Sequence, residues 1–120
     1  MILADTSLWI DHFRRGNAAL RELLESDEVV MHPFVIGELA CGSLKNRYEI
    51  LDLLARLPQA TIADHGEVMN LVESKRLYNK GIGWIDAHLL ASALLADIAL
   101  LTLDKPLLEV AGSLGIRASL

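Results

Sequence analysis

The chain has 120 residues, of which 52% are hydrophobic and 22% are charged, a composition that excludes disorder of the whole chain and predicts one globular domain. Its 11 basic and 16 acidic residues give a net charge of −5, which excludes nucleic-acid binding through bulk positive charge alone. The one cysteine, Cys41, cannot form an internal disulfide, and the longest apolar stretch, residues 89–103, is too short to span a bilayer. We therefore expect a cytoplasmic protein without a membrane anchor.

Short apolar runs and helical patterns alternate along the first half of the chain. Residues 1–4 are predicted to form a buried strand that ends at Asp5-Thr6-Ser7, three residue types that favour helix N-caps. In chain order, the next predicted elements are a helix around 8–13, a helix around 20–24, a strand at 29–31, a helix from His32-Pro33 to Cys41 and a helix at 48–57.

The second half continues the alternation. Its predicted elements are a strand at 60–63, a helix at 64–78, a loop at 81–84, a buried helix at 85–96, a strand at 99–103, a helix at 107–114 and an edge strand at 116–118. Apolar strands that alternate with helices predict an α/β fold, a parallel sheet with helices on both faces. In such a sheet the ligand site lies outside the carboxyl ends of the strands.

Four acidic residues fall at positions that this fold brings toward one edge. Asp5 and Asp104 each follow a predicted strand, where a helix N-cap is the alternative role. Asp86 opens the buried helix, where an Asp also complements the helix dipole. Glu38 lies inside a helix between apolar residues, so capping does not explain it; an exposed polar position or an ion pair is the alternative.

The expected proximity of these four carboxylates has a chemical consequence. Two carboxylates about 5 Å apart repel by about 3 kcal/mol at an effective dielectric near 20, so a cluster raises its own pKa values or recruits a cation. Oxygen ligands suit Mg²⁺ or Mn²⁺ rather than zinc, and such a pocket serves phosphodiester cleavage. Three hydroxyl residues beside the acids can position water or phosphate, with capping and turn formation as the alternative: Thr6, Ser7 and Thr102.

Taken together, these residues resemble the PIN domains, and specifically the VapC-type toxins of bacterial and archaeal toxin–antitoxin pairs. The similarity lies in Asp5-Thr6-Ser7, in Glu38, in the segment GIGWIDAHLLA at 81–91 and in the segment Leu101-Thr102-Leu103-Asp104-Lys105. It covers essentially the whole chain. Each motif is short, and their order and spacing make the resemblance specific.

The resemblance implies a single PIN domain with a flavodoxin-like fold over residues 1–120, acting as a Mg²⁺- or Mn²⁺-dependent endoribonuclease. It implies that Asp5 and Asp86 bind the metal directly, and that Glu38 and Asp104 complete the pocket through water or a second ion. Thr6 and Thr102 match hydroxyl positions that support the acids and the bound water. It also implies a homodimer and a VapB-type antitoxin whose tail covers the active site.

Two other functions stay open at this point. A receiver-like phosphoacceptor signalling domain also has acids at strand ends and a Lys-Pro pair such as Lys105-Pro106. However, Ala4 stands where a receiver usually has a second acid, and we find no phosphoacceptor Asp after a central strand. In a non-enzymatic binding module the acids would only cap helices, an interpretation that Glu38 weakens. That module would show no effect of divalent metal on its melting temperature.

RNA binding requires local basic groups, because the overall charge is negative. Sequence specificity for RNA usually depends on exposed loops or stacking platforms. The basic candidates, each of which is otherwise an ordinary surface charge, are Arg14, Arg15, Lys45, Arg47, Lys75, Arg76, Lys80 and Lys105. Trp9 and Trp84 are candidate stacking platforms, although we expect both in the core.

Overall fold

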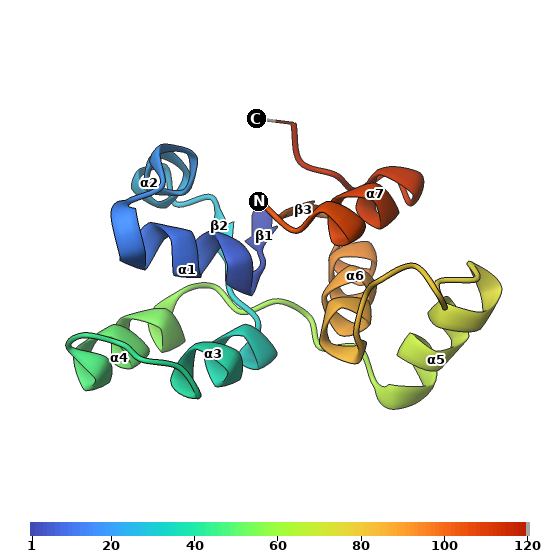
Figure 1. Ribbon diagram of the computed structural model, residues 1–120, viewed down its shortest axis with the longest axis horizontal. Helices are drawn as coiled ribbons and strands as arrows, with labels where there is room; N and C mark the ends of the chain where they lie inside the picture. Colours follow the sequence, from blue (N-terminus) through green and yellow to red (C-terminus); the bar gives the residue numbers. More distant parts are fainter. Residues whose placement is uncertain (120) are drawn as a thin grey trace.

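The computed structural model describes residues 1–119, and its centre is a parallel sheet of three short strands (Figure 1). The strands are β1 (Ile2–Ala4), β2 (Val29–Val30) and β3 (Ala99–Leu101), in the spatial order β2-β1-β3. The register pairs Ala4 of β1 with Leu101 of β3, so these two strands end at the same edge of the sheet.

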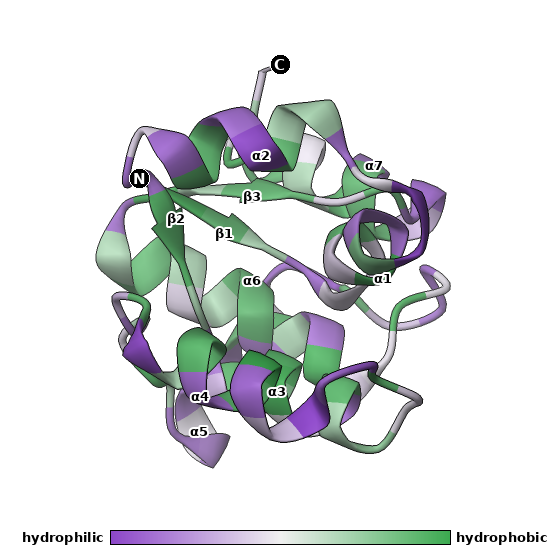
Figure 2. Cartoon of the chain, turned by 90° about the vertical axis from the view of Figure 1, so that its left-hand side faces the viewer, coloured by the Kyte–Doolittle hydropathy of each residue, from purple (hydrophilic) through white to green (hydrophobic). Residues whose placement is uncertain are grey.

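Seven helices flank the sheet within residues 1–119. They are α1 (Thr6–Arg15), α2 (Ala18–Glu25), α3 (Pro33–Ala40), α4 (Arg47–Arg56), α5 (His65–Ser74), α6 (Trp84–Ala96) and α7 (Lys105–Ser113). Figure 2 shows α2 and α7 on one side of the sheet and α3, α4, α5 and α6 on the other. The predicted α/β architecture, with helices on both faces of a parallel sheet, is confirmed.

Two predicted strands are reduced to single parallel bridges. The strand expected at 60–63 is wrong: the chain pairs with β2's end only at Met31↔Gln59 and then diverges. The backbone hydrogen bonds of this pairing are those that Met31 makes with Pro58 and Ala60. The edge strand expected at 116–118 is likewise one bridge, Leu100↔Arg117. The helix predicted to reach residue 78 ends at Ser74, and Arg76 then adopts a left-handed backbone with a φ of 53°.

The core lies between the sheet and α6. Leu3 and Leu100 in adjacent strands are fully buried, and seven consecutive residues of α6, Ala87–Ala93, are buried as well. This confirms the prediction of a buried helix here. The core position expected for Trp9 is also confirmed, but that for Trp84 is wrong. Trp84 is 41% exposed, because it is the first residue of α6 and stands at the open end of the helix.

Within residues 1–119, no helix has the length and apolar character needed to cross a membrane.

Candidate active site

Asp5 is the most buried of the four acids and lies where β1 ends and α1 begins. Its backbone N–H donates to the carbonyl of Leu101 at 3.0 Å, which extends the β1–β3 pairing by one residue. Its side chain caps α1 by accepting a hydrogen bond from the Leu8 N–H at 3.3 Å. The capping role considered from the sequence is therefore present, and it aims the carboxylate at the carboxyl edge of the sheet.

Two hydroxyl groups hold the Asp5 carboxylate. Ser7 Oγ donates to Asp5 Oδ1 and Thr102 Oγ1 donates to Asp5 Oδ2, both at 2.6 Å. Thr102 comes directly after β3, so the strand register places it opposite Asp5. Each hydroxyl in turn accepts a backbone N–H at 3.0 Å, from Leu103 and Asp104 respectively. This network connects the end of β1 to the turn before α7 and leaves the carboxylate little freedom to rotate.

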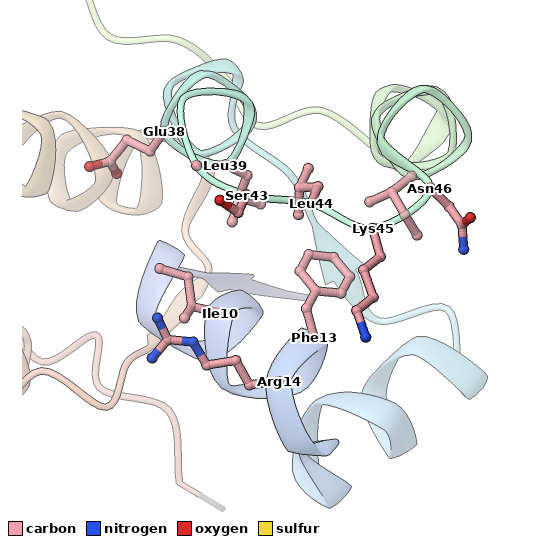
Figure 3. A pocket seen from close by; sticks show the side chains of 11 residues that line it. Ile10, Phe13, Arg14, Glu38, Leu39, Ser43, Leu44, Lys45 and Asn46 are labelled. Atoms are coloured by element: carbon pink, nitrogen blue, oxygen red, sulfur yellow. The ribbon is translucent and has the colours of Figure 1, made fainter.

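Glu38 and Thr6 form a second pair at the same edge. Thr6 Oγ1 donates to Glu38 Oε1 at 2.6 Å, which joins the first turn of α1 to α3. Glu38 is exposed despite its apolar sequence neighbours, so the exposed-position alternative describes it correctly. Figure 3 shows its carboxylate pointing away from Lys45 and Asn46 and toward α6, the helix that carries Asp86.

Asp86 and Asp104 also make capping hydrogen bonds. Asp86 Oδ2 accepts the backbone N–H of Gly83 at 3.1 Å, which closes the first turn of α6. Asp104 Oδ2 accepts the Leu107 N–H at 3.1 Å and caps α7. Sequence reasoning missed the role of Gly83, although its spacing of three residues before Asp86 matches a helix-start pattern.

Negative charges among the four acids affect the pKa values of Asp5 and Asp86. Burial raises the pKa of Asp5, against hydrogen bonds from Ser7, Thr102 and Leu8 that lower it, and the charge of Asp86 raises it further. Burial also raises the pKa of Asp86, with the Gly83 N–H opposing and the charges of Asp104 and Glu38 adding to the rise. The negative charge of Asp86 therefore acts on Asp5, and those of Asp104 and Glu38 act on Asp86.

The donor chemistry of this edge fits a hard divalent cation. Within residues 1–119 no group of three or more His, Cys, Asp or Glu side chains is close enough together to hold a metal ion. Yet the described hydrogen bonds leave one oxygen free of protein donors on Asp86, Asp104 and Glu38. Asp5 uses about three of its four lone-pair sites. Oxygen ligands with mutual repulsion match Mg²⁺ or Mn²⁺.

A mainly apolar cleft of about 660 Å³ has Glu38 in its lining (Figure 3). It lies between α1, α3 and the start of α4. Its apolar lining consists of Ile10, Phe13, Leu39, Leu44 and Ile50. Arg14 and Lys45, two of the basic candidates, also line it. The cleft therefore has one acidic side chain, Glu38, while the rest of its lining is mainly apolar and includes the basic Arg14 and Lys45.

Replacing Thr102 with valine is expected to lower the free energy of unfolding by about 2 kcal/mol, because the Asp5 carboxylate and the Asp104 N–H each lose a buried partner. The isosteric side chain keeps the packing, so the loss reports on the hydroxyl. Urea denaturation measures it, with the exposed Thr61→Val as the matched control. Equal stability of both variants would show that the hydroxyl network contributes nothing.

Comparison with known proteins gives two findings. The family model described as "PIN domain" matches residues 2–113. The chain is also 49% identical over 117 residues to a protein named "Ribonuclease VapC32" from Mycobacterium tuberculosis strain CDC 1551 / Oshkosh, covering 97% of this chain and 94% of that protein. The same identity and coverage are found with the protein of that name from strain ATCC 25618 / H37Rv.

Proposed function

The chain belongs to the PIN domain family, and on that premise we propose that it is a Mg²⁺- or Mn²⁺-dependent endoribonuclease, the toxin of a VapBC-type pair that acts in the cytoplasm. The observation that carries the proposal is the hydrogen-bond network at the carboxyl edge of the sheet, where Thr102 links Asp5 to Asp104 and Thr6 links α1 to Glu38. The charge of Asp86 acts on Asp5 at the same edge. The similarity to a ribonuclease over nearly the whole chain supports it and leaves the receiver and binding-module alternatives without support.

In this proposal Asp5 and Asp86 would bind the metal directly, and Glu38 and Asp104 would complete the pocket through water or with a second ion. A divalent cation held there would supply Lewis-acid chemistry, polarising the phosphate and lowering the pKa of a bound water. Ser7 and Thr102 hold the Asp5 carboxylate in one orientation. Thr6 does the same for Glu38, whose exposed carboxylate is accessible to water and phosphate.

The proposed antitoxin partner has a suitable surface in the mainly apolar cleft that has Glu38 in its lining. A peptide segment with apolar side chains would cover Ile10 and Phe13, which are 38% and 36% exposed. Because Glu38 lines the cleft, an Arg or Lys of that segment can reach its carboxylate and compete with metal and substrate. The homodimer expected from the sequence stays a prediction.

The proposal is tested by incubating the purified chain, free of any partner, with a mixed RNA pool. We expect cleavage with Mg²⁺ or Mn²⁺ and none with excess EDTA, because the acids alone cannot offset the charge on the phosphate. Gel electrophoresis of end-labelled RNA measures the products. The same metals are expected to raise the melting temperature by binding the folded state.

A folded chain that neither cleaves RNA nor gains stability from metal would overturn the proposal. Metal stabilisation without cleavage of the pool would call for structured RNAs, individual transfer RNAs first. Cleavage that persists in EDTA would contradict the metal dependence and leave the ribonuclease assignment standing.

A further inference from the structure

A second, smaller pocket of about 160 Å³ lies between the end of α5 and the start of α6. We call it the aromatic pocket, because Tyr78 and Trp84 line it and are 51% and 41% exposed. Its remaining lining is apolar side chain and Gly83 backbone, with Leu77 and Ala87 buried beneath. Two large exposed aromatic side chains around one small recess are unusual in a chain that is 5% aromatic.

The Trp84 ring is held in place by its neighbours. The His88 ring packs edge-on against it, with ring centroids 4.7 Å apart and an interplanar angle of 87°. The His65 ring also packs against Trp84, with ring centroids 5.1 Å apart. Phe34 in α3 supports His88 in turn, at 4.6 Å. Trp84 is therefore a rigidly mounted aromatic surface, which lowers the entropic cost of stacking a ligand on it.

The aromatic pocket adjoins the acidic edge. Gly83 lines the pocket, and its N–H donates to Asp86 Oδ2 at 3.1 Å. On the other side of the loop, a Cβ added at Gly81 would lie 3.2 Å from Pro106 Cβ, so the loop packs closely on the start of α7, which Asp104 caps. A ligand in the pocket would therefore lie next to the proposed metal ligands.

The segment that contributes Leu77 and Tyr78 to the pocket also carries positive charge. Residues 75–80 contain Lys75, Arg76 and Lys80 and no acidic residue, in a chain whose net charge is −5. All three side chains are exposed, and none forms an ion pair within residues 1–119. Because the acidic edge repels phosphate, a substrate backbone needs such cations close by.

From this arrangement we propose that the aromatic pocket binds one unpaired nucleobase of the RNA substrate. The base stacks on Trp84 beside Tyr78, and Lys75, Arg76 and Lys80 contact the flanking phosphates. Bases splayed out of single-stranded loops stack on aromatic side chains in this way, whereas bases within a duplex are not available. The inference rests on the proposed ribonuclease function and adds a base-binding subsite at Trp84 and Tyr78 to it.

The test measures binding of a fluorescently labelled single-stranded RNA oligonucleotide by anisotropy. It is done in the Asp5→Asn background, so that the RNA stays intact. Adding Trp84→Ala is expected to raise the Kd about tenfold, the effect of losing one stacked base. Trp84→Phe keeps an aromatic surface and is expected to restore most of the affinity. Tyr48→Ala is the matched control, because Tyr48 is 85% exposed on α4 and does not line the pocket.

An unchanged Kd in folded Trp84→Ala, or an equal loss in Trp84→Phe, would overturn the inference. So would an equal loss of affinity for a fully paired duplex. Melting temperatures show whether Trp84→Ala folds; if it does not, Trp84→Leu and Tyr78→Ala replace it. Cleavage by the otherwise native chain separates the two proposals. Metal-dependent cleavage with an unchanged Kd refutes only the aromatic pocket, whereas a folded chain that neither cleaves RNA nor gains stability from metal refutes the ribonuclease.

Discussion

Replacing Asp86 with asparagine is expected to lower the rate of RNA cleavage by about a thousandfold or more, because the carboxylate coupled to all three other acids loses its charge. The fold is expected to survive. The amide oxygen of asparagine can still accept the Gly83 N–H, and removal of one like charge relieves the repulsion from Asp104 and Glu38. Initial rates on one RNA substrate, at saturating Mg²⁺, measure the effect.

The matched control for this substitution is Asp97→Asn, at the other end of the same helix. Asp97 is exposed and has a left-handed backbone with a φ of 53°, a conformation that asparagine adopts readily. Its cleavage rate and melting temperature are expected to match those of the unmodified chain. Cleavage by Asp86→Asn within tenfold of the Asp97→Asn rate would remove Asp86 from the proposed metal ligands.

Acidification from pH 7 to pH 4.5 is expected to lower the free energy of unfolding by about 2 to 3 kcal/mol through His32 alone. His32 is fully buried, and burial, together with the charge of His88, lowers its pKa from 6.5 to about 4. The unfolded chain therefore binds more protons between these two pH values. The contribution of His32 to stability is complete above pH 6.5 and is lost as the pH falls toward 4. Urea denaturation at a series of pH values measures this dependence.

Two variants separate the His32 effect from that of other groups. His32→Asn removes the titrating ring but can still cap α3 by accepting the Phe34 N–H, so its stability is expected to depend less on pH. Ser92→Ala removes the hydroxyl 3.1 Å from His32 Nε2 but keeps the ring, so the pH dependence is expected to remain. The same pH slope in His32→Asn as in the unmodified chain would assign acid sensitivity to other groups.

Local sequence patterns were enough to predict the order of the helices and the parallel sheet. Asp5 and Asp104 were placed at strand ends by the apolar runs before them, and both cap helices there. The predicted strand at 60–63 failed for a reason outside that segment. A strand needs a neighbouring strand with which its backbone groups can form several hydrogen bonds in succession. The segment finds only one such partner residue, Met31, next to the two-residue β2.

The amino-acid sequence by itself determined which acids and hydroxyls this protein has and at which edge of the sheet they emerge, because apolar periodicity and capping are local properties. The tertiary structure alone decided how they pair. Thr102 meets Asp5 through strand register, and Thr6 meets Glu38 through the packing of α1 near α3. It also decided that Glu38 and Trp84 are exposed although their neighbours are apolar. Exposure depends on which distant elements cover a residue, and no local pattern contains that information.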